Sequence, residues 1–161
     1  MVFAIGSSAF VHGGRIPPLY TCEGNRFMSP PLSLTCAPEG TQSVAIIMED
    51  PDVPRVLLPD GLFVHWVVFN IPAMPNTTVE LTEGGSFGVL GVNTRGENTY
   101  TGPCPPTEFL PNEHRYFFYA HALNTVLELS VGATKQEVLT AMEGHVLVSA
   151  QLMGTYKKGV Q

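Results

Sequence analysis

Positive charge is scarce in this chain. Its 161 residues include only 8 Lys and Arg against 14 Asp and Glu, which gives a formal net charge of -6. Proteins that bind nucleic acid or anionic membranes need clustered cations, and the densest basic feature here is Lys157-Lys158. We therefore expect neither partner. One small anion can still bind, because its binding needs local hydrogen-bond donors rather than net charge.

Long apolar runs are missing as well. No stretch approaches the roughly 20 residues of a membrane span, and residues 1–6 lack the cationic region that begins a secretory signal. These absences predict a protein without stable membrane insertion and with a cytoplasmic location. The length and the hydrophobic fraction of 44% favour one globular domain over residues 1–161.

Cysteine is rare, and Cys22, Cys36 and Cys104 show no metal-ligand spacing. We predict no metal site and no cofactor. Buried free thiols are the favoured interpretation of these cysteines. The alternative pairs Cys22 with Cys104, because both lie in turn-like segments. The odd number leaves at least one thiol free in either case.

Glycine and proline, in contrast, are plentiful, at 16 and 14, and are spread along the chain rather than gathered in a linker. This pattern is typical of strands joined by structured loops. Apolar or alternating segments rich in β-prone residues predict the strands themselves. They cover residues 32–36, 43–48, 62–71 and 115–123, with shorter candidates at 127–129 and 152–156.

Helix signals are confined to the C-terminal part of the chain. Thr134 and Glu137 match a capping box, apolar residues follow at helical spacing as far as Met142, and Gly144 is a suitable stop. Residues 145–151 are the candidate for a second helix. Strands first and helices last predict a mostly β fold, an antiparallel β-sandwich with peripheral C-terminal helices.

Two segments around the strongest strands carry acid–base chemistry. Asp50 and Asp52 lie in a proline-restricted turn after a predicted strand, although such a turn alone is more often solvated. His65 lies within the apolar strand 62–71. It is either a core histidine with one hydrogen bond or an imidazole whose proton is controlled by an acid such as Asp50. Simple alternation places Phe63, His65, Val67 and Phe69 on one face, and Val64, Trp66 and Val68 on the other.

The third segment is YTGPCPP, residues 100–106, followed by His114 and Tyr116. The loop is rigid, and Gly102 lets its backbone approach a ligand. His114 and Tyr116 are two apart on a strand and point the same way, so an imidazole and a phenol can both donate to an oxyanion. Alone, they are equally consistent with a strand-start histidine and a core tyrosine. Together, the three segments predict one pocket for a phosphate-like anion.

These motifs, in order along nearly the whole chain, resemble the phosphatidylethanolamine-binding protein family, and more narrowly its bacterial and archaeal Raf-kinase-inhibitor-like branch. The similar segments are residues 16–17, 20–24, 29–32, 50–54, 65–72, 100–106, 114–116, 132–145 and 154–156. The stretch 95–98 departs from the usual Asn-Asp-Phe-Gly pattern of that branch.

The resemblance implies an antiparallel β-sandwich with an anion pocket at one end of its larger sheet. It also implies ligands such as phosphate, phosphoryl head groups, acetate or cacodylate-like ions, and a homodimer. The residues that it places around the pocket are Asp50, Asp52, His65, Gly102, His114 and Tyr116.

A non-enzymatic binding protein is the function that these features favour, with both histidines donating to the anion. The alternative is an inhibitor of a partner protease or kinase that acts through the loops around the pocket. A hydrolase is the third possibility, but the chain has no nucleophile elbow and no P-loop. Cys104 is the one candidate nucleophile, and its flanking prolines favour a structural role.

Overall fold

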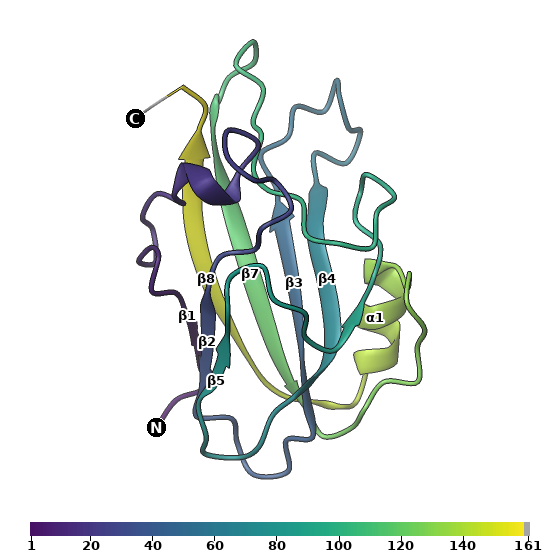
Figure 1. Cartoon of the computed structure of the whole chain (residues 1–161). Helices are drawn as coiled ribbons and strands as arrows, with labels where there is room; N and C mark the ends of the chain where they lie inside the picture. The colour runs from purple at the N-terminus through teal and green to yellow at the C-terminus, as the bar shows by residue number, and fades with distance from the viewer. Residues whose placement is uncertain (160–161) are drawn as a thin grey trace.

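Alternating apolar side chains build two antiparallel sheets that pack face to face (Figure 1). The computed structural model describes residues 1–159. The smaller sheet has the order β1-β2-β5, with β1 at Ala4–Gly6, β2 at Leu32–Thr35 and β5 at Val79–Leu81. The larger sheet has the order β6-β4-β3-β7-β8. Its strands are β3 at Ser43–Asp50, β4 at Phe63–Pro72, β6 at Val89–Leu90, β7 at Glu113–Leu123 and β8 at Val146–Lys157. The predicted β-sandwich is confirmed.

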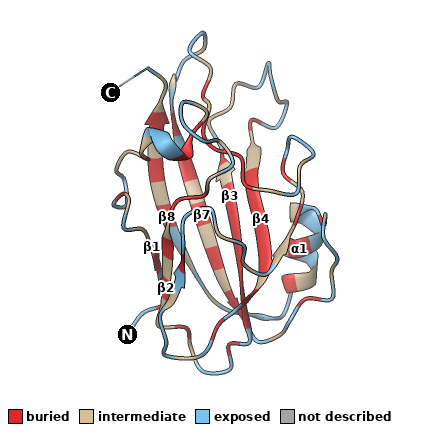
Figure 2. Cartoon of the chain, viewed as in Figure 1, coloured by how far each residue is buried: buried red, intermediate tan, exposed pale blue. Residues whose placement is uncertain are grey.

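The main core lies between the two sheets. Leu34 of β2 packs in the same buried cluster as Ile46 of β3 and Phe118 of β7, and all three side chains are almost fully removed from solvent. Figure 2 shows buried residues following β3, β4 and β7 along most of their lengths. Each fully buried aliphatic or aromatic side chain contributes roughly 1.5–3 kcal/mol, so this cluster is the main source of stability.

A second apolar cluster covers the outer face of β3 and β4. There Ile47 and Phe69 pack in one cluster with Val138 and Met142 of α1, which spans Lys135–Met142. The predicted capping box is present, because the Thr134 hydroxyl accepts from the Glu137 N–H at 3.1 Å, and the Glu137 carboxylate accepts from the Thr134 N–H at 2.9 Å. α1 is therefore a peripheral helix that buries one face of the larger sheet.

The second predicted helix, residues 145–151, is wrong. The chain forms the start of β8 instead, and β8 pairs with β7 from Val146 to Lys157. Gly144 has a φ of 79°, which ends the helix and turns the chain back along the sheet. The apolar residues of this stretch belong to a long strand. Within residues 1–159, α1 is the single α-helix, and a short 3-10 helix lies at Pro18–Tyr20.

The short strand predicted at residues 127–129 is also absent. Leu127 is instead held by the side chain of Asn70, which accepts from the Leu127 N–H at 2.8 Å and donates to its carbonyl at 2.9 Å. Asn70 has a φ of 56° at an irregularity of β4, so a side-chain amide takes the place of a ladder partner.

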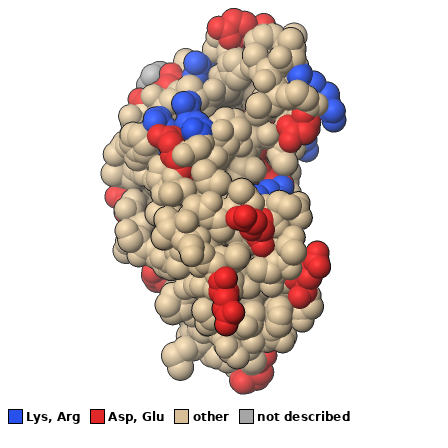
Figure 3. Space-filling view, turned by 90° about the vertical axis from the view of Figure 1, so that its right-hand side faces the viewer, with Lys and Arg blue, Asp and Glu red and all other residues tan. Residues whose placement is uncertain are grey.

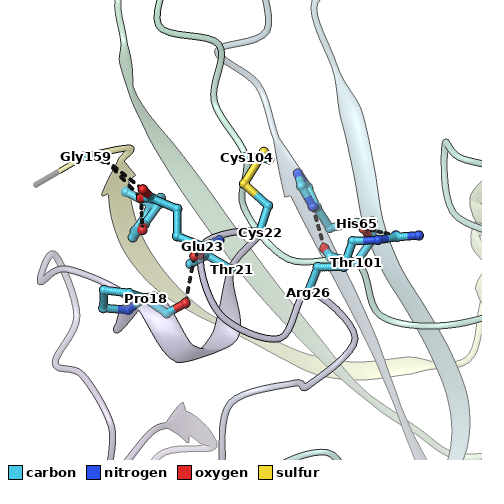
Figure 4. Close-up of a disulfide and its surroundings, with 10 residues drawn as sticks. Pro18, Thr21, Cys22, Glu23, Arg26, His65, Thr101, Cys104 and Gly159 are labelled. Carbon is cyan, nitrogen blue, oxygen red and sulfur yellow. Dashed lines mark hydrogen bonds between the residues drawn. A yellow bond between two sulfur atoms is a disulfide. The ribbon is translucent and has the colours of Figure 1, made fainter.

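Cys22 and Cys104 form a disulfide, so the favoured interpretation of free thiols was wrong for this pair (Figure 4). Cys36 is free. Two backbone hydrogen bonds accompany the disulfide, from the Cys22 N–H to the Pro103 carbonyl at 3.0 Å and from the Gly102 N–H to the Arg26 carbonyl at 2.7 Å. The N-terminal loop is thereby tied to the loop that follows residue 100.

Strand β4 contains a bulge at His65. Met48 pairs with Trp66 and Glu49 pairs with Val64, so His65 is an extra residue opposite β3. Because of the bulge, Val64 packs on the outer face with Val67, whereas His65 turns to the inner side, where its ring meets Tyr116. The simple alternation predicted for this strand was therefore wrong at the residue that matters most for the site.

Candidate functional site

A cavity of about 300 Å³ opens at one end of the larger sheet. β3 ends there at Asp50, and its two neighbours, β4 and β7, begin there. In Figure 1 the loops before β4 and before β7 rise above this end of the sheet. The lining residues are Asp50, Val53, Leu57, Leu58, Phe63, His65, Arg95, Gly102, Cys104, Pro105, Pro106, His114 and Tyr116.

Asp52 is the predicted site residue that does not line the cavity. Its carboxylate accepts two hydrogen bonds from the Arg115 guanidinium, at 2.8 and 3.0 Å, and one from the Arg115 N–H at 2.9 Å. These contacts, led by the side-chain bonds, lower the pKa of Asp52 although partial burial opposes them. Asp52 therefore fixes the turn after β3 against the start of β7.

Asp50 and His114 form a buried ion pair in the cavity wall. The His114 Nδ1 lies 2.6 Å from the Asp50 carboxylate, and its Nε2 lies 3.1 Å from the Pro111 carbonyl. Both neighbours are acceptors, so both ring nitrogens carry a proton. Burial works against this charge, but Asp50 outweighs it and raises the pKa of His114. Because both N–H groups are taken, His114 does not donate to a ligand as predicted; it neutralises Asp50.

His65 has the opposite protonation. Its Nδ1 lies 2.6 Å from the Thr101 carbonyl, an acceptor, so Nδ1 carries the proton (Figure 4). The side chain is only 5% exposed. Burial, with smaller effects of Arg95 and His114, outweighs the Thr101 carbonyl and Asp50 and lowers the pKa of His65 to about 4. The ring is therefore neutral near pH 7, and its Nε2 is a lone-pair acceptor.

Tyr116 completes the polar part of the cavity. Its ring lies edge-on to His65, with centroids 5.3 Å apart, and its side chain is fully buried. Burial and then the charge of Asp50 raise its pKa, so the hydroxyl keeps its proton. Within residues 1–159 that hydroxyl makes no hydrogen bond of normal geometry, although it lies close enough to the Asp50 carboxylate for this contact to help raise its pKa. Few buried hydroxyls in proteins lack a well-formed hydrogen bond.

Gly102 is explained by packing against the backbone rather than by space for a ligand. A Cβ at this position would lie 2.3 Å from the Tyr20 carbonyl oxygen and 2.9 Å from the Thr21 Cα. The neighbouring Thr101 makes two hydrogen bonds to His65. The Thr101 N–H donates to the His65 carbonyl at 3.0 Å, and the Thr101 carbonyl accepts from the His65 ring. Gly102 therefore lets the loop pack against Tyr20 and Thr21, and this position of the loop fixes the orientation of the His65 ring through Thr101.

Sequence reasoning missed Arg95 and the apolar wall. Arg95 lies in an exposed loop, which is organised by the buried Asn93 side chain through bonds to the Arg95 N–H at 2.9 Å and the Glu97 N–H at 3.1 Å. The available signal was the departure at residues 95–98 from the related pattern. For the wall, the signal was the run Val56-Leu57-Leu58 inside a loop, where apolar residues are unusual.

Lys and Arg are distributed unevenly over the face seen in Figure 3. In the face seen in Figure 3, Lys and Arg lie only in the upper half, near the pocket loops, whereas Asp and Glu are spread over its whole length. Within residues 1–159, no group of three or more His, Cys, Asp or Glu side chains could hold a metal ion, and no helix has the length and apolarity to cross a membrane.

Known proteins share both the sequence and the fold of this chain. A UPF0098 protein of Chlamydia muridarum is 48% identical over 154 residues, covering 94% of this chain and 97% of its own. Another, from the archaeon Methanothermobacter thermautotrophicus, is 45% identical over 157 residues, covering 94% and 96%.

Two crystal structures are similar. A proposed phosphatidylethanolamine-binding protein homologue of Chlamydia trachomatis superposes with a TM-score of 0.89 at 44% identity, covering 98% of each chain. Escherichia coli YbcL, described as a new member of the mammalian family, superposes with a TM-score of 0.81 at 26% identity, covering 96% of this chain and 98% of its own. The sequence profile of the phosphatidylethanolamine-binding proteins matches residues 6–157. The chain therefore belongs to the phosphatidylethanolamine-binding protein family, as the motifs in its sequence predicted.

Proposed function

We propose that this protein binds a phosphoryl-type anion together with the organic group attached to it. The observation that carries the proposal is Tyr116, which lines the cavity and whose buried hydroxyl makes no hydrogen bond of normal geometry within residues 1–159. Arg95, at the cavity lining, adds a cation whose side chain donates no hydrogen bond to another residue within 1–159. A phenol and a guanidinium are both strong donors to an oxyanion.

The acids of the site do not oppose this proposal. Carboxylates repel anions, but Asp50 is neutralised by His114 and Asp52 by Arg115. The negative charge of each acid is therefore matched by a cation at 2.6 and 2.8 Å. What remains for the ligand is the Tyr116 phenol, the Arg95 guanidinium and the neutral ring of His65.

The rest of the cavity is suited to an apolar organic group. Phe63 and Pro105 line it together with aliphatic residues of the loop between β3 and β4. A volume of about 300 Å³ lies at the small end of the range for ligand pockets. The pocket thus matches a compact monoester with a short apolar or aromatic substituent better than a large polar molecule.

Catalysis is not part of the proposal. The one candidate nucleophile, Cys104, is bonded to Cys22 and has no thiol to offer. His114 has both ring nitrogens engaged, so it cannot exchange a proton with a substrate without breaking its pair with Asp50.

Substitution of Tyr116 tests the proposed function. Titration calorimetry with phenyl phosphate at pH 6 should show binding to the protein, and Tyr116→Phe should weaken it about tenfold or more, since a hydrogen bond to a charged group contributes about 1.5–3 kcal/mol. Tyr119→Phe is the matched control, because Tyr119 lies on the other face of β7 and stacks on Phe117. Equal affinity of Tyr116→Phe and the wild-type protein would remove the hydroxyl from the site.

The second candidate function, inhibition of a partner protease or kinase, is favoured by exposed apolar residues on the loops beside the cavity. Val56 is 77% exposed and Leu110 is 87% exposed. A contiguous patch of exposed apolar side chains often marks a contact with another protein, and Val56 with its half-exposed neighbour Leu57 forms one short apolar stretch on its loop. Homodimer formation stays a prediction. A cytoplasmic location also stays one, and the Cys22–Cys104 disulfide argues against it because such bonds persist mainly in oxidising compartments.

A further inference from the structure

The polar atoms that line the cavity include both hydrogen-bond donors and a hydrogen-bond acceptor. Among the side chains that line it, the Asp50 carboxylate is already engaged, because its two oxygens accept from the Asp52 N–H and from His114. Three other groups have capacity to spare: the Tyr116 hydroxyl, the Arg95 guanidinium and the Nε2 of His65. The first two donate. The third accepts, since the proton of the neutral ring is held on Nδ1 by the Thr101 carbonyl at 2.6 Å. A ligand that satisfies all three must bring acceptors and one donor.

The surroundings of His65 keep its ring neutral. The charged groups that act on it are Asp50 from β3, His114 from β7 and Arg95 from the loop after β6. The two cations together oppose a third positive charge, and the one acid is already paired with His114. The aromatic rings of Phe63 and Tyr116 pack against the imidazole, with centroids 4.5 and 5.3 Å away.

A fully ionised oxyanion is therefore poorly matched to this wall. Sulfate, sulfate esters and phosphodiesters bring only acceptor oxygens at neutral pH, and one of those oxygens would face the lone pair of Nε2. An acceptor facing an acceptor leaves both groups unsatisfied in a buried site, which is costly. A phosphomonoester differs, because its second ionisation has a pKa near about 6 and its singly protonated form carries one P–O–H.

We propose that the pocket selects oxyanions that carry one ionisable proton, which means phosphomonoesters over sulfate esters. The P–O–H donates to His65 Nε2, while the other oxygens accept from Tyr116 and Arg95. The proposal rests on the proposed function and names its ligand class. The Nε2 of His65 is the specificity-determining atom.

Proton balance gives the proposal a direct readout. Near pH 8 a phosphomonoester is mostly dianionic, so forming the complex takes up about one proton from solution. The proton count is the same whether the proton ends on the phosphoryl oxygen or on Nε2. Near pH 5 the free ligand already carries that proton, and uptake falls to about zero. Affinity should therefore fall about tenfold for each pH unit above 7.

The test compares phenyl phosphate with phenyl sulfate, which share their organic group and differ in the ionisable proton. Titration calorimetry at pH 5 measures the two affinities, and titrations at pH 5 and pH 8 in two buffers of different ionisation enthalpy measure the number of protons taken up. At pH 5, where free phenyl phosphate already carries its proton, we expect it to bind at least about tenfold more tightly than phenyl sulfate, the cost of an unsatisfied buried acceptor. Proton uptake should be close to one at pH 8 and close to zero at pH 5.

The variant His65→Gln removes the fixed acceptor, since an amide can turn either its oxygen or its NH2 toward the cavity. It should bring the two ligands to within about threefold of each other and abolish the pH-dependent proton uptake. His121→Gln is the matched control on the outer face of β7, where His121 meets Ser149 at 2.7 Å. It should behave as the wild-type protein.

Two failures can be told apart. If phenyl phosphate does not bind at pH 5 or pH 8, the proposed function is wrong and this inference falls with it. If phenyl phosphate binds, but phenyl sulfate binds equally well and no proton is taken up at pH 8, the inference alone is overturned. The wild-type measurements decide this even if His65→Gln does not fold.

Discussion

At the scale of single residues, the site depends on two histidines in different charge states, one on each strand that flanks β3. His114 faces a carboxylate and a carbonyl and is charged, whereas His65 faces one carbonyl and is neutral. The difference arises from partners and not from residue type, because both rings are buried. One histidine neutralises an acid, and the other offers a lone pair.

Asp50→Asn should lower the pKa of His114 by about one unit or more, because the variant keeps the shape of the side chain and removes the charge that opposes desolvation. NMR titration of the imidazole signals measures this shift. Asp52→Asn is the control on the same turn, since Asp52 pairs with Arg115 and acts on His114 only through space. Equal shifts in both variants would show that the Asp50–His114 bond does not set the charge of His114.

Gly102→Ala should destabilise the protein by about 2 kcal/mol or more and weaken the binding of phenyl phosphate, since the overpacked loop must move. The new methyl group would lie 2.3 Å from the Tyr20 carbonyl, and Thr101, which holds His65, would move with it. Gly96→Ala is a suitable comparison. Gly96 also lies in a loop near the cavity, but its Cβ would meet nothing within 4 Å, so its cost should come only from its φ of 80°. Urea unfolding of both variants measures the difference.

At the scale of elements, a bulge and a disulfide shape the cavity. The bulge in β4 turns His65 out of the regular alternation and toward Tyr116. The disulfide ties the loop at residue 22 to Cys104, which itself lines the cavity. Neither feature belongs to the hydrophobic core, so the cavity wall can be loosened without dismantling the sandwich.

Removing the disulfide should lower both stability and affinity. The bond joins residues 82 positions apart, and closing a loop of this length contributes on the order of 4 kcal/mol through the unfolded state. The double variant Cys22→Ser with Cys104→Ser should therefore unfold at lower urea concentration and bind phenyl phosphate more weakly. Cys36→Ser, which removes the free thiol, should change neither property. Unchanged affinity in the double variant would show that the loop holds its shape without the bond.

At the scale of the whole molecule, the two histidines affect the pH dependence of the free energy of unfolding in opposite directions. The pKa of His65 is about 4 in the folded protein against 6.5 as its ordinary value, so the unfolded chain binds the extra proton first as pH falls. Stability is therefore lost from pH 6.5 toward pH 4. The raised pKa of His114 works in the other direction, and its contribution is present below pH 6.5 and is lost as pH rises through the folded value.

Urea unfolding should show the free energy of unfolding falling by about 2 kcal/mol between pH 7 and pH 5 because of His65, as follows from 1.36 kcal/mol per pKa unit. His121 shifts in the same direction through burial, so the comparison must be with His65→Gln, which keeps His121. The variant should lose distinctly less stability over this range. Parallel curves for the two proteins would assign the acid sensitivity to other groups.

Much of the molecule could be predicted from local patterns. The β-prone segments 43–48, 62–71 and 115–123 became strands, and the capping box at Thr134 began the helix, because alternation and capping act between residues close in sequence. The convergence of Asp50, His65, His114 and Tyr116 could also be predicted, since each lies near the same end of a strand in an antiparallel sandwich.

The tertiary structure alone decided what these residues do. The predicted helix at residues 145–151 is instead the start of β8, because from Val146 onward its backbone pairs with β7. Asp52 does not line the cavity, because its carboxylate binds the Arg115 guanidinium. The tautomer of His65 depends on a carbonyl 36 residues away, and the charge of His114 on a carboxylate 64 residues away. Hydrogen-bond partners and burial are set by segments distant in sequence, whereas a strand or a helix cap is determined mainly by residues close to it in sequence.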